Sequence, residues 1–323
     1  MGVGVIIRTV LGDINPEQLG LTLGHDHLYA SPPADVSDPD LRIDDEAASI
    51  AEAKVFAEVG GSGVVEMTTV DYGRDVGVLE RVSRASGIHL IAATGFNKGK
   101  FADPLTTGRS VREIAAWMIR EVSHGVQSFS PDQPVNEQSG AKAGLIKASS
   151  GLNGANPNEL KVFEAAIEAH GASGAPISTH TEKGTWALEQ VRLLLDGGVN
   201  PTKVLIGHLD LKPDLAYLKE IATTGVNLGI DQFAKEKYLP DARRVELIVE
   251  LVEAGHGRQI LIGGDLARRS YWKTHGDPYG FSFIPLRVRP MLKGAGLSEA
   301  RVDDILIHNP RRFLAFNPRE VPV

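Results

Sequence analysis

The chain has 323 residues, of which 42% are hydrophobic and 23% are charged, an ordinary globular composition. A net charge of −7 argues against a nucleic-acid surface, and no run of about 18 apolar residues predicts a membrane span. The absence of cysteine excludes disulfides and thiolate metal ligands. With no signal-peptide pattern at the N-terminus, we expect a cytoplasmic protein without a nucleic-acid or membrane partner.

Short apolar, β-branched runs alternate with amphipathic segments along the whole chain. Eight of these runs have the length and composition of buried strands. They are Leu21–His27, Gly63–Thr69, His89–Gly95, Ala143–Ser149, Pro176–Thr181, Val204–Asp210, Val226–Asp231 and Gln259–Asp265.

The segments between the strands carry apolar residues at every third or fourth position, which is the helix period. The clearest are Glu46–Val59, Val111–His124, Glu159–His170, Trp186–Leu195, Asp214–Thr223 and Ala242–Ala254. Eight strand–helix units in about 250 residues predict an α/β protein, a (β/α)8 TIM barrel forming a single domain over residues 1–323. The alternative is an open doubly wound sheet, which is disfavoured because no Gly-x-Gly-x-x-Gly turn follows the first strand.

Three further segments complete this outline. Ser128–Ala141 is polar and is predicted to be a mobile excursion. Arg268–Leu292, rich in aromatic residues, Pro and Arg, is predicted to be a long loop over the barrel mouth. Ser298–Phe316 is predicted to be the last helix of the chain.

Candidate metal ligands lie where the strands end, which is where such barrels place their active sites. His25 and His27 leave the same side of an extended strand, because residues i and i+2 share a face. Four further candidates end strands four, five, six and eight: Lys147, His180, His208 and Asp265. This nitrogen and oxygen set predicts a site for divalent Zn, Mn, Co or Fe.

Lys147 is the unusual member of this set, because an ammonium group has no lone pair to offer a metal. It lies outside the ligand shell, or carbon dioxide converts it to a carbamate that bridges two ions. The residues alone leave both possibilities open.

The order His-x-His, Lys, His, His, Asp on these strands resembles the binuclear amidohydrolase superfamily. More narrowly, the chain is similar over nearly its whole length to the phosphotriesterase-like lactonase family. The matching stretches are Gly20–Leu28, Gly73–Asp75, Ala93–Gly95, Gly144–Lys147, Pro176–Thr181, Leu205–His208 and Asn309–Pro310.

This resemblance implies two metal ions, with zinc as the first choice, and a homodimer. It implies that His25, His27 and Asp265 bind one ion and that His180 and His208 bind the other. A carbamylated Lys147 and a hydroxide would bridge the ions. Asp265 would take the proton of the attacking hydroxide and return it to the leaving oxygen.

The substrate loops depart from the family's usual pattern. Asn97 and Lys98 stand near the position where its lactonases carry a Tyr. Asp231–Gln232 replaces the Asp-Arg pair favoured by the acyl-homoserine-lactone branch. Both departures argue against that substrate class and against efficient organophosphate hydrolysis.

Cationic residues gather on the predicted mouth loops, which suits an anionic substrate group. The segment around Arg268–Trp272 also resembles the branch that opens sugar lactones, including phosphorylated furanose lactones. The candidate substrate-binding residues are Asn97, Lys98, Lys183, Asp231, Arg268, Arg269, Tyr271 and Lys273, and Lys100 belongs to the same cationic group.

We therefore expect a metal-dependent hydrolase that opens a small-molecule sugar-acid lactone bearing an anionic group. The alternatives are amidase, esterase or phosphotriesterase activity at the same centre, or a metal-bearing binding protein. Glu66 is left open as a possible partner of a ligand. The remaining histidines are predicted to be caps or surface residues: His89, His124, His170, His256, His275 and His308.

Overall fold

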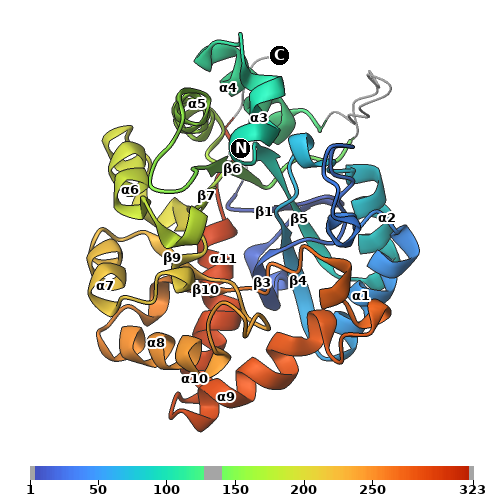
Figure 1. The fold of residues 1–323 in the computed structure, drawn as a ribbon, viewed down its shortest axis with the longest axis vertical. Coiled ribbons are helices and arrows are strands. Elements are labelled where there is room, and N and C mark those ends of the chain that lie inside the picture. The colour runs from blue at the N-terminus through green and yellow to red at the C-terminus, as the bar shows by residue number, and fades with distance from the viewer. Residues whose placement is uncertain (1–3, 127–139, 320–323) are drawn as a thin grey trace.

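The computed structural model describes residues 4–126 and 140–319, and Figure 1 shows helices surrounding a central sheet. Eight parallel strands form this sheet in the order β10-β9-β8-β7-β6-β5-β4-β3. They are β3 (Leu21–Asp26), β4 (Gly61–Glu66), β5 (His89–Gly95), β6 (Leu145–Ser149), β7 (Ile177–His180), β8 (Val204–Ile206), β9 (Asn227–Ile230) and β10 (Ile260–Ile262). All eight predicted strands are present, and several end earlier than predicted.

The first and last strands of the sheet meet, so that it forms a barrel. The backbone N–H of Asp265, just beyond β10, donates to the carbonyl of His25 in β3 at 3.0 Å. The Asp26 carboxylate accepts from the N–H groups of Gly264 at 3.1 Å and Leu266 at 3.0 Å. The (β/α)8 barrel is thereby confirmed over the doubly wound sheet, whose edge strands lie far apart.

Helices cover the outside of the barrel, and polar side chains begin several of them. Asp45 accepts from the N–H of Ala48 and Asp75 from that of Val78, which satisfies backbone donors of the first turn. The longer helices are α1 (Glu46–Glu58), α2 (Val76–Ser86), α3 (Gly99–Thr106), α4 (Val111–Ser123), α5 (Pro157–Ser173), α6 (Ala187–Asp196), α7 (Leu215–Thr223) and α8 (Asp241–Glu253). The six predicted helices are among them.

The predicted mouth loop Arg268–Leu292 is only half correct. Short 3-10 turns occupy its first part, whereas Ile284–Val288 forms a π-helical turn that continues into α9 (Arg289–Gly294). Pro285 stands at the start of this helical run, where its missing N–H is tolerated, and Pro290 directly follows the π-helical turn.

The last helix is present and contains a π-helical turn at Asp304–His308, between α10 (Glu299–Asp303) and α11 (Asn309–Leu314). The polar segment predicted over 128–141 lies outside the described residues, apart from residues 140 and 141. Within 4–126 and 140–319, no helix has the length and apolar character needed to cross a membrane.

A cluster of apolar side chains fills the barrel interior at the end opposite the carboxyl ends of the strands. Its residues from the barrel strands are Val65, Ile91, Ala93, Leu145, Leu205 and Leu261. Ile7 of the hairpin β1 (Ile7–Thr9) and β2 (Gly12–Ile14), together with Phe313 of α11, belongs to the same buried cluster. Because this end is closed by apolar packing, the polar side chains of the strands gather at the opposite, carboxyl end.

Candidate metal centre

The six predicted ligands line one cavity of about 340 Å³ at the carboxyl ends of the strands. They are His25, His27, Lys147, His180, His208 and Asp265. The ring centres of His25 and His27 are 5.8 Å apart, those of His25 and His208 4.7 Å, and those of His180 and His208 4.6 Å. Five strand ends therefore bring these side chains together, as the sequence predicted.

Two of the six side chains depend on unusual backbone conformations. His208 has φ 59° and Asp265 has φ 46°, the left-handed region that non-glycine residues seldom adopt. Hydrogen bonds hold both turns, since the N–H of His208 donates to Asp231 at 3.1 Å and that of Asp265 donates to the carbonyl of His25. Such conformations persist where the surroundings fix them, often at functional sites.

A glycine is required where β5 ends beside Lys147. Gly95 has φ +91°, and a Cβ atom there would lie 2.0 Å from the carbonyl oxygen of Lys147. The missing side chain lets the two strands approach closely, and Lys147 lies in the lining of the cavity.

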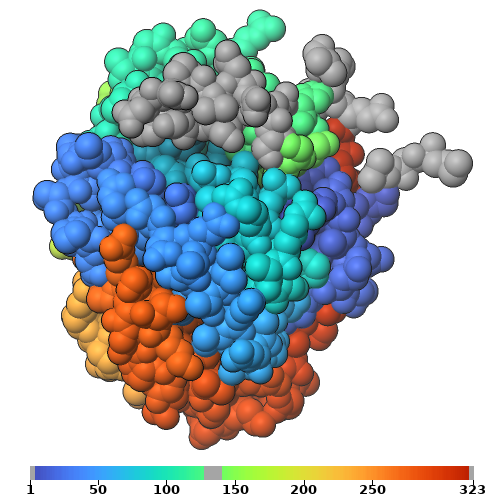
Figure 2. Space-filling model, turned by 90° about the vertical axis from the view of Figure 1, so that its right-hand side faces the viewer, coloured from blue at the N-terminus to red at the C-terminus, as the bar shows by residue number. Residues whose placement is uncertain are grey.

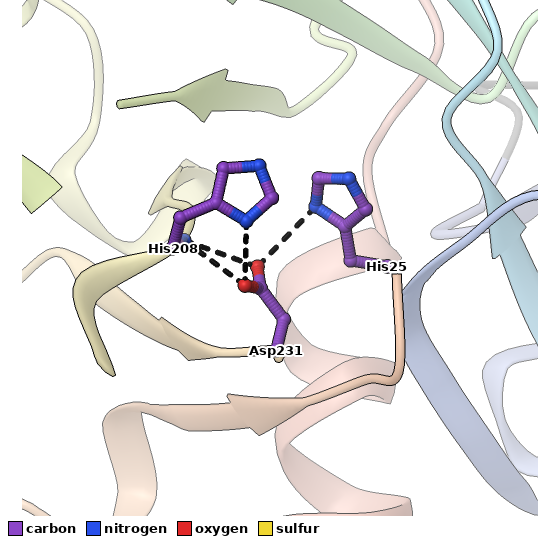
Figure 3. A group of neighbouring side chains, drawn as sticks. All are labelled: His25, His208 and Asp231. Carbon is purple, nitrogen blue, oxygen red and sulfur yellow. Dashed lines mark hydrogen bonds and ion pairs between the residues drawn. The ribbon is translucent and has the colours of Figure 1, made fainter. Parts of the chain in front are cut away.

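Asp231 orients two of the histidine rings (Figure 3). Its Oδ1 lies 2.8 Å from Nδ1 of His208, and its Oδ2 lies 3.3 Å from Nδ1 of His25. Since Asp231 occupies the Nδ1 side of each ring, Nε2 remains for the cavity. A carboxylate behind a ligating imidazole is a recurrent feature of metal sites.

A second polar chain orients His27. Its Nδ1 lies 2.8 Å from the hydroxyl of Thr68, which donates to Glu66 at 2.6 Å. The hydroxyl therefore accepts from Nδ1 of His27, and Nε2 faces Asp265 with its lone pair. The sequence left open whether Glu66 supports a ligand. In the structure Glu66 is buried and accepts the Thr68 hydrogen bond, and burial raises its pKa to about 7.

Burial keeps most of these imidazoles neutral. It lowers the pKa of His25 to about 4 although Asp231 opposes the shift, and it also lowers the pKa of His27 and, strongly, that of His180. For His208, burial is outweighed by the charge and hydrogen bond of Asp231, so its pKa is raised. Neutral imidazole nitrogens are the form that binds metals.

Lys147 lies 4% exposed between the histidines, and its Nζ donates to the carbonyl of Met67 at 3.0 Å. Burial lowers the pKa of its ammonium group, although Asp265, Asp71 and Glu66 oppose the shift. At a given pH a larger fraction of Lys147 is therefore the neutral amine, which is the form that can react with carbon dioxide.

The donor set fits a pair of divalent ions. Ligand atoms of His25, His27 and Asp265 all lie within 4.8 Å of one another, with Asp265 Oδ1 3.3 Å from Nε2 of His27. The rings of His180 and His208 are neighbours, with their centres 4.6 Å apart and one edge toward the other ring. A set of imidazole and carboxylate donors suits the borderline transition metals rather than calcium or magnesium.

Four of the eight predicted substrate residues line the cavity: Asn97, Lys98, Arg268 and Tyr271. The Nζ of Lys98 contacts Glu182, whose carboxylate lies 3.4 Å from Nε2 of His180. Arg268 donates to Asp38 at 2.6 Å and to Asp40 at 3.3 Å.

The other four predicted substrate residues lie outside the cavity lining. Lys183 and Lys273 are exposed. Arg269 donates to the carbonyl of Arg42 and to Asp44 instead. Asp231 is buried behind the histidine rings, where it contacts His25 and His208.

Seven further residues line the cavity without having been singled out as site residues: Leu41, Tyr72, Phe101, Gln232, Lys235, Tyr238 and Ala267. Gln232 and Lys235 both contact Asp265. Their place directly after the seventh predicted strand was the available signal, since that is where barrel loops carry site residues.

The fold and this site define a barrel hydrolase with a histidine-rich centre. The model of the phosphotriesterase family matches residues 5–314, and the chain belongs to that family, whose members are binuclear metal hydrolases. A protein of Mycoplasmopsis synoviae named phospho-furanose lactonase is 37% identical over 97% of this chain and 92% of its own length.

Two solved structures are also similar. An amidohydrolase from Mycoplasma synoviae has a TM-score of 0.94 at 36% identity, covering 98% of this chain and 93% of its own. A lactonase from Listeria monocytogenes has a TM-score of 0.89 at 33% identity, covering 96% and 99%. The resemblance seen in the sequence, and the assignment as a hydrolase, are thereby confirmed.

Proposed function

We propose that this protein is a lactonase that uses two divalent metal ions to open the ring of a sugar-acid lactone carrying an anionic group such as phosphate. The observation that carries the proposal is a cationic rim beside the candidate metal centre. The relative named phospho-furanose lactonase supports the same substrate class.

The cationic rim consists of Arg268, Lys237 and the Tyr271 between them. Arg268 and Tyr271 line the cavity, and Nζ of Lys237 lies 5.3 Å from the centre of the Tyr271 ring. A hydrogen bond with Tyr271 raises the pKa of Lys237. Guanidinium, ammonium and phenol groups around one opening provide the donors that a phosphate recognises.

His25, His27 and Asp265 would hold one ion and His180 and His208 the other, with Lys147, as a carbamate, between them. Zinc is our first choice among the metals that accept these donors. When bound, such a pair polarises a carbonyl oxygen and lowers the pKa of a water molecule, so that hydroxide is available near neutral pH.

Asp265 is the residue of this chain that would move the proton. Burial disfavours its charge, but opposing interactions, of which the largest is with the ammonium of Lys235, outweigh burial and hold its pKa well below the usual range. The ionised carboxylate would accept the proton of the attacking hydroxide as the carbon–oxygen bond forms. It then returns this proton to the ring oxygen as the ester bond breaks, giving an open-chain hydroxy acid.

The test is a substrate panel with the metal-loaded protein, followed by proton release as the carboxylic acid forms. The panel contains five-membered sugar-acid lactones with and without a terminal phosphate, an acyl-homoserine lactone, an aryl ester, an N-acyl amino acid and a phosphotriester. We expect the phosphorylated lactones to have the highest kcat/KM. Turnover of the amide, the ester or the phosphotriester with inert lactones would replace the proposal with the corresponding hydrolase.

A further inference from the structure

Lys235 is a buried lysine whose ammonium group is fully occupied by neighbouring acceptors. It lies between β9 and α8 and is 4% exposed. Its Nζ donates to Oδ2 of Asp265 at 2.8 Å, to the backbone carbonyl of Asp265 at 2.6 Å and to Oε1 of Gln232 at 2.9 Å. Because an ammonium group has three hydrogens, these contacts leave none for a substrate.

These contacts divide the two carboxylate oxygens of Asp265 between different partners. Oδ2 accepts from Lys235 and, at 2.8 Å, from the side-chain amide of Gln232. Oδ1 faces the imidazoles instead, 3.3 Å from Nε2 of His27 and 3.6 Å from Nε2 of His25. One oxygen is therefore anchored in the protein, and the other is presented to the candidate metal position.

The backbone of Asp265 also needs such an anchor. It lies three residues beyond β10 and has the left-handed φ of 46°. Lys235 bonds the carbonyl of this same residue, while its N–H is held by His25. A single cation thus fixes both the main chain and the side chain of Asp265.

Lys98, in the cavity lining, and Lys237, beside Tyr271, differ from Lys235. Lys98 has a side chain 34% exposed and contacts Glu182, and Lys237 is exposed at the rim. Lys235 also lines the cavity, but its Nζ is taken up by the contacts described above and lies 5.3 Å from the centre of the Tyr271 ring. Its surroundings are those of an internal support rather than of a substrate ligand.

We propose that Lys235 is a positioning residue for Asp265, and that through its contacts with this aspartate it sets the metal affinity of the His25–His27–Asp265 side of the centre. This inference rests on the proposed metal-dependent function but is independent of which lactone is the substrate. Partners that hold a ligating carboxylate typically change metal affinity by about 10- to 100-fold when removed.

The experiment compares three variants of the metal-loaded protein. Lys235→Met removes the ammonium and keeps the chain length, and Lys235→Arg restores a cation. Lys203→Met is the matched control, because Nζ of Lys203 donates to backbone carbonyls, among them that of Arg312 at 2.6 Å, at the opposite end of the barrel. Metal affinity is measured by competition with a chelator, and the absorption spectrum of the cobalt-substituted protein reports the ligand geometry.

We expect Lys235→Met to bind one of the two ions about 10- to 100-fold more weakly and to change the cobalt spectrum. Lys235→Arg should recover part of the affinity. Lys203→Met should lower Tm and leave both metal readouts unchanged. If Lys235→Met does not fold, Lys235→Gln replaces it in the same measurements.

The inference is overturned if Lys235→Met keeps both affinities and the parent spectrum while KM for the lactone rises, since Lys235 would then be a substrate ligand. A loss of metal equal to that in Lys203→Met would also overturn it, because the effect would be one of general stability. A parent protein that binds no divalent ion would instead contradict the proposed function, and with it this inference.

Discussion

Asp231 Oδ1 lies 2.8 Å from Nδ1 of His208, and this contact turns the opposite nitrogen of the ring toward the cavity. The same carboxylate meets Nδ1 of His25 at 3.3 Å and accepts the backbone N–H of His208. A single buried aspartate thus orients one candidate ligand from each proposed metal position. The sequence suggested that Asp231 binds substrate. Because it lies behind the imidazole rings, we expect it to affect metal affinity instead.

Replacing Asp231 should weaken metal binding more than it weakens the fold. In Asp231→Asn the charge that supports His25 and His208 is lost, although an amide oxygen can still accept a hydrogen bond. We expect the metal content after dialysis against a chelator to fall with an affinity loss of about 10- to 100-fold. The exposed carboxylate of Asp196 provides the control Asp196→Asn. If Asp231→Asn retains as much metal as Asp196→Asn, Asp231 does not support metal binding.

Lys147 should carry a carbamate in the metal-loaded protein. Isotopically labelled bicarbonate should give a carbamate signal in carbon NMR spectra of the parent, and Lys147→Met should lose both this signal and the lactonase activity. The reason is that a buried amine with a lowered pKa can react with carbon dioxide, whereas its ammonium form has no lone pair for a metal. Two bound ions without such a signal would show that Lys147 acts without this modification.

Arg268 and Arg269 are neighbours in the chain that should differ in effect. Arg268 lines the cavity, whereas Arg269 bonds Arg42 and Asp44. Arg268→Met should raise KM for a phosphorylated lactone by about 10-fold and change KM for the unphosphorylated lactone much less. Arg269→Met is the control and should leave this ratio unchanged. Similar losses on both substrates would place the anionic group elsewhere.

Both arginines tie the segment after β10 to the loop after β3, which Figure 2 shows as an orange surface lying against a blue one. The experiment therefore needs the paired variants, since each substitution removes a contact with this loop. Only Arg268 combines such a contact with a place in the cavity lining.

Asp71 should make stability depend on pH in the metal-free protein. Burial raises its pKa from the ordinary 3.8 to about 6, despite hydrogen bonds from Thr69 and Asn97. A carboxyl group with a raised folded-state pKa favours folding fully below the unfolded value and loses that contribution as pH rises through 6. Asp71→Asn should therefore gain up to about 3 kcal/mol relative to the parent between about pH 4 and pH 8.

Urea unfolding of the chelator-treated proteins at the two pH values measures this difference. An Asn side chain can still accept the N–H of Asn97 and donate to the Thr69 hydroxyl, so the hydrogen bonds need not be lost. Asp196→Asn should show no comparable dependence on pH. A free-energy difference for Asp71→Asn that is the same at both pH values would contradict the prediction.

The histidine-rich centre was predictable because its signals are periodic and local. His25 and His27 share a strand face by simple geometry, and each remaining candidate ligand follows an apolar run. The barrel was predictable for the same reason. By contrast, Ile284–Leu292 was predicted as loop, because Pro285 and Pro290 obscured a helical segment that carries Ile284, Val288 and Leu292 into the core.

The supporting residues were less predictable, because turns rather than periodicity place them. Lys235 and Lys237 are alike in the sequence, yet the first is buried on Asp265 and the second is exposed. The turn at Ala234, with φ 68°, precedes Lys235, and its left-handed backbone has no clear signature in an alanine. Which of two neighbouring cations enters a pocket depends on such tertiary contacts.

The proposed metal-dependent lactonase function is tested most directly by the rate of lactone opening as metal is restored to the chelator-stripped protein. The substrate is a phosphorylated five-membered sugar-acid lactone, and bound metal is measured in the same samples. We expect no turnover without metal and a rate that reaches its maximum when two ions are bound per chain. Full activity in the metal-free protein, or inert lactones with both ions bound, would contradict the proposed function.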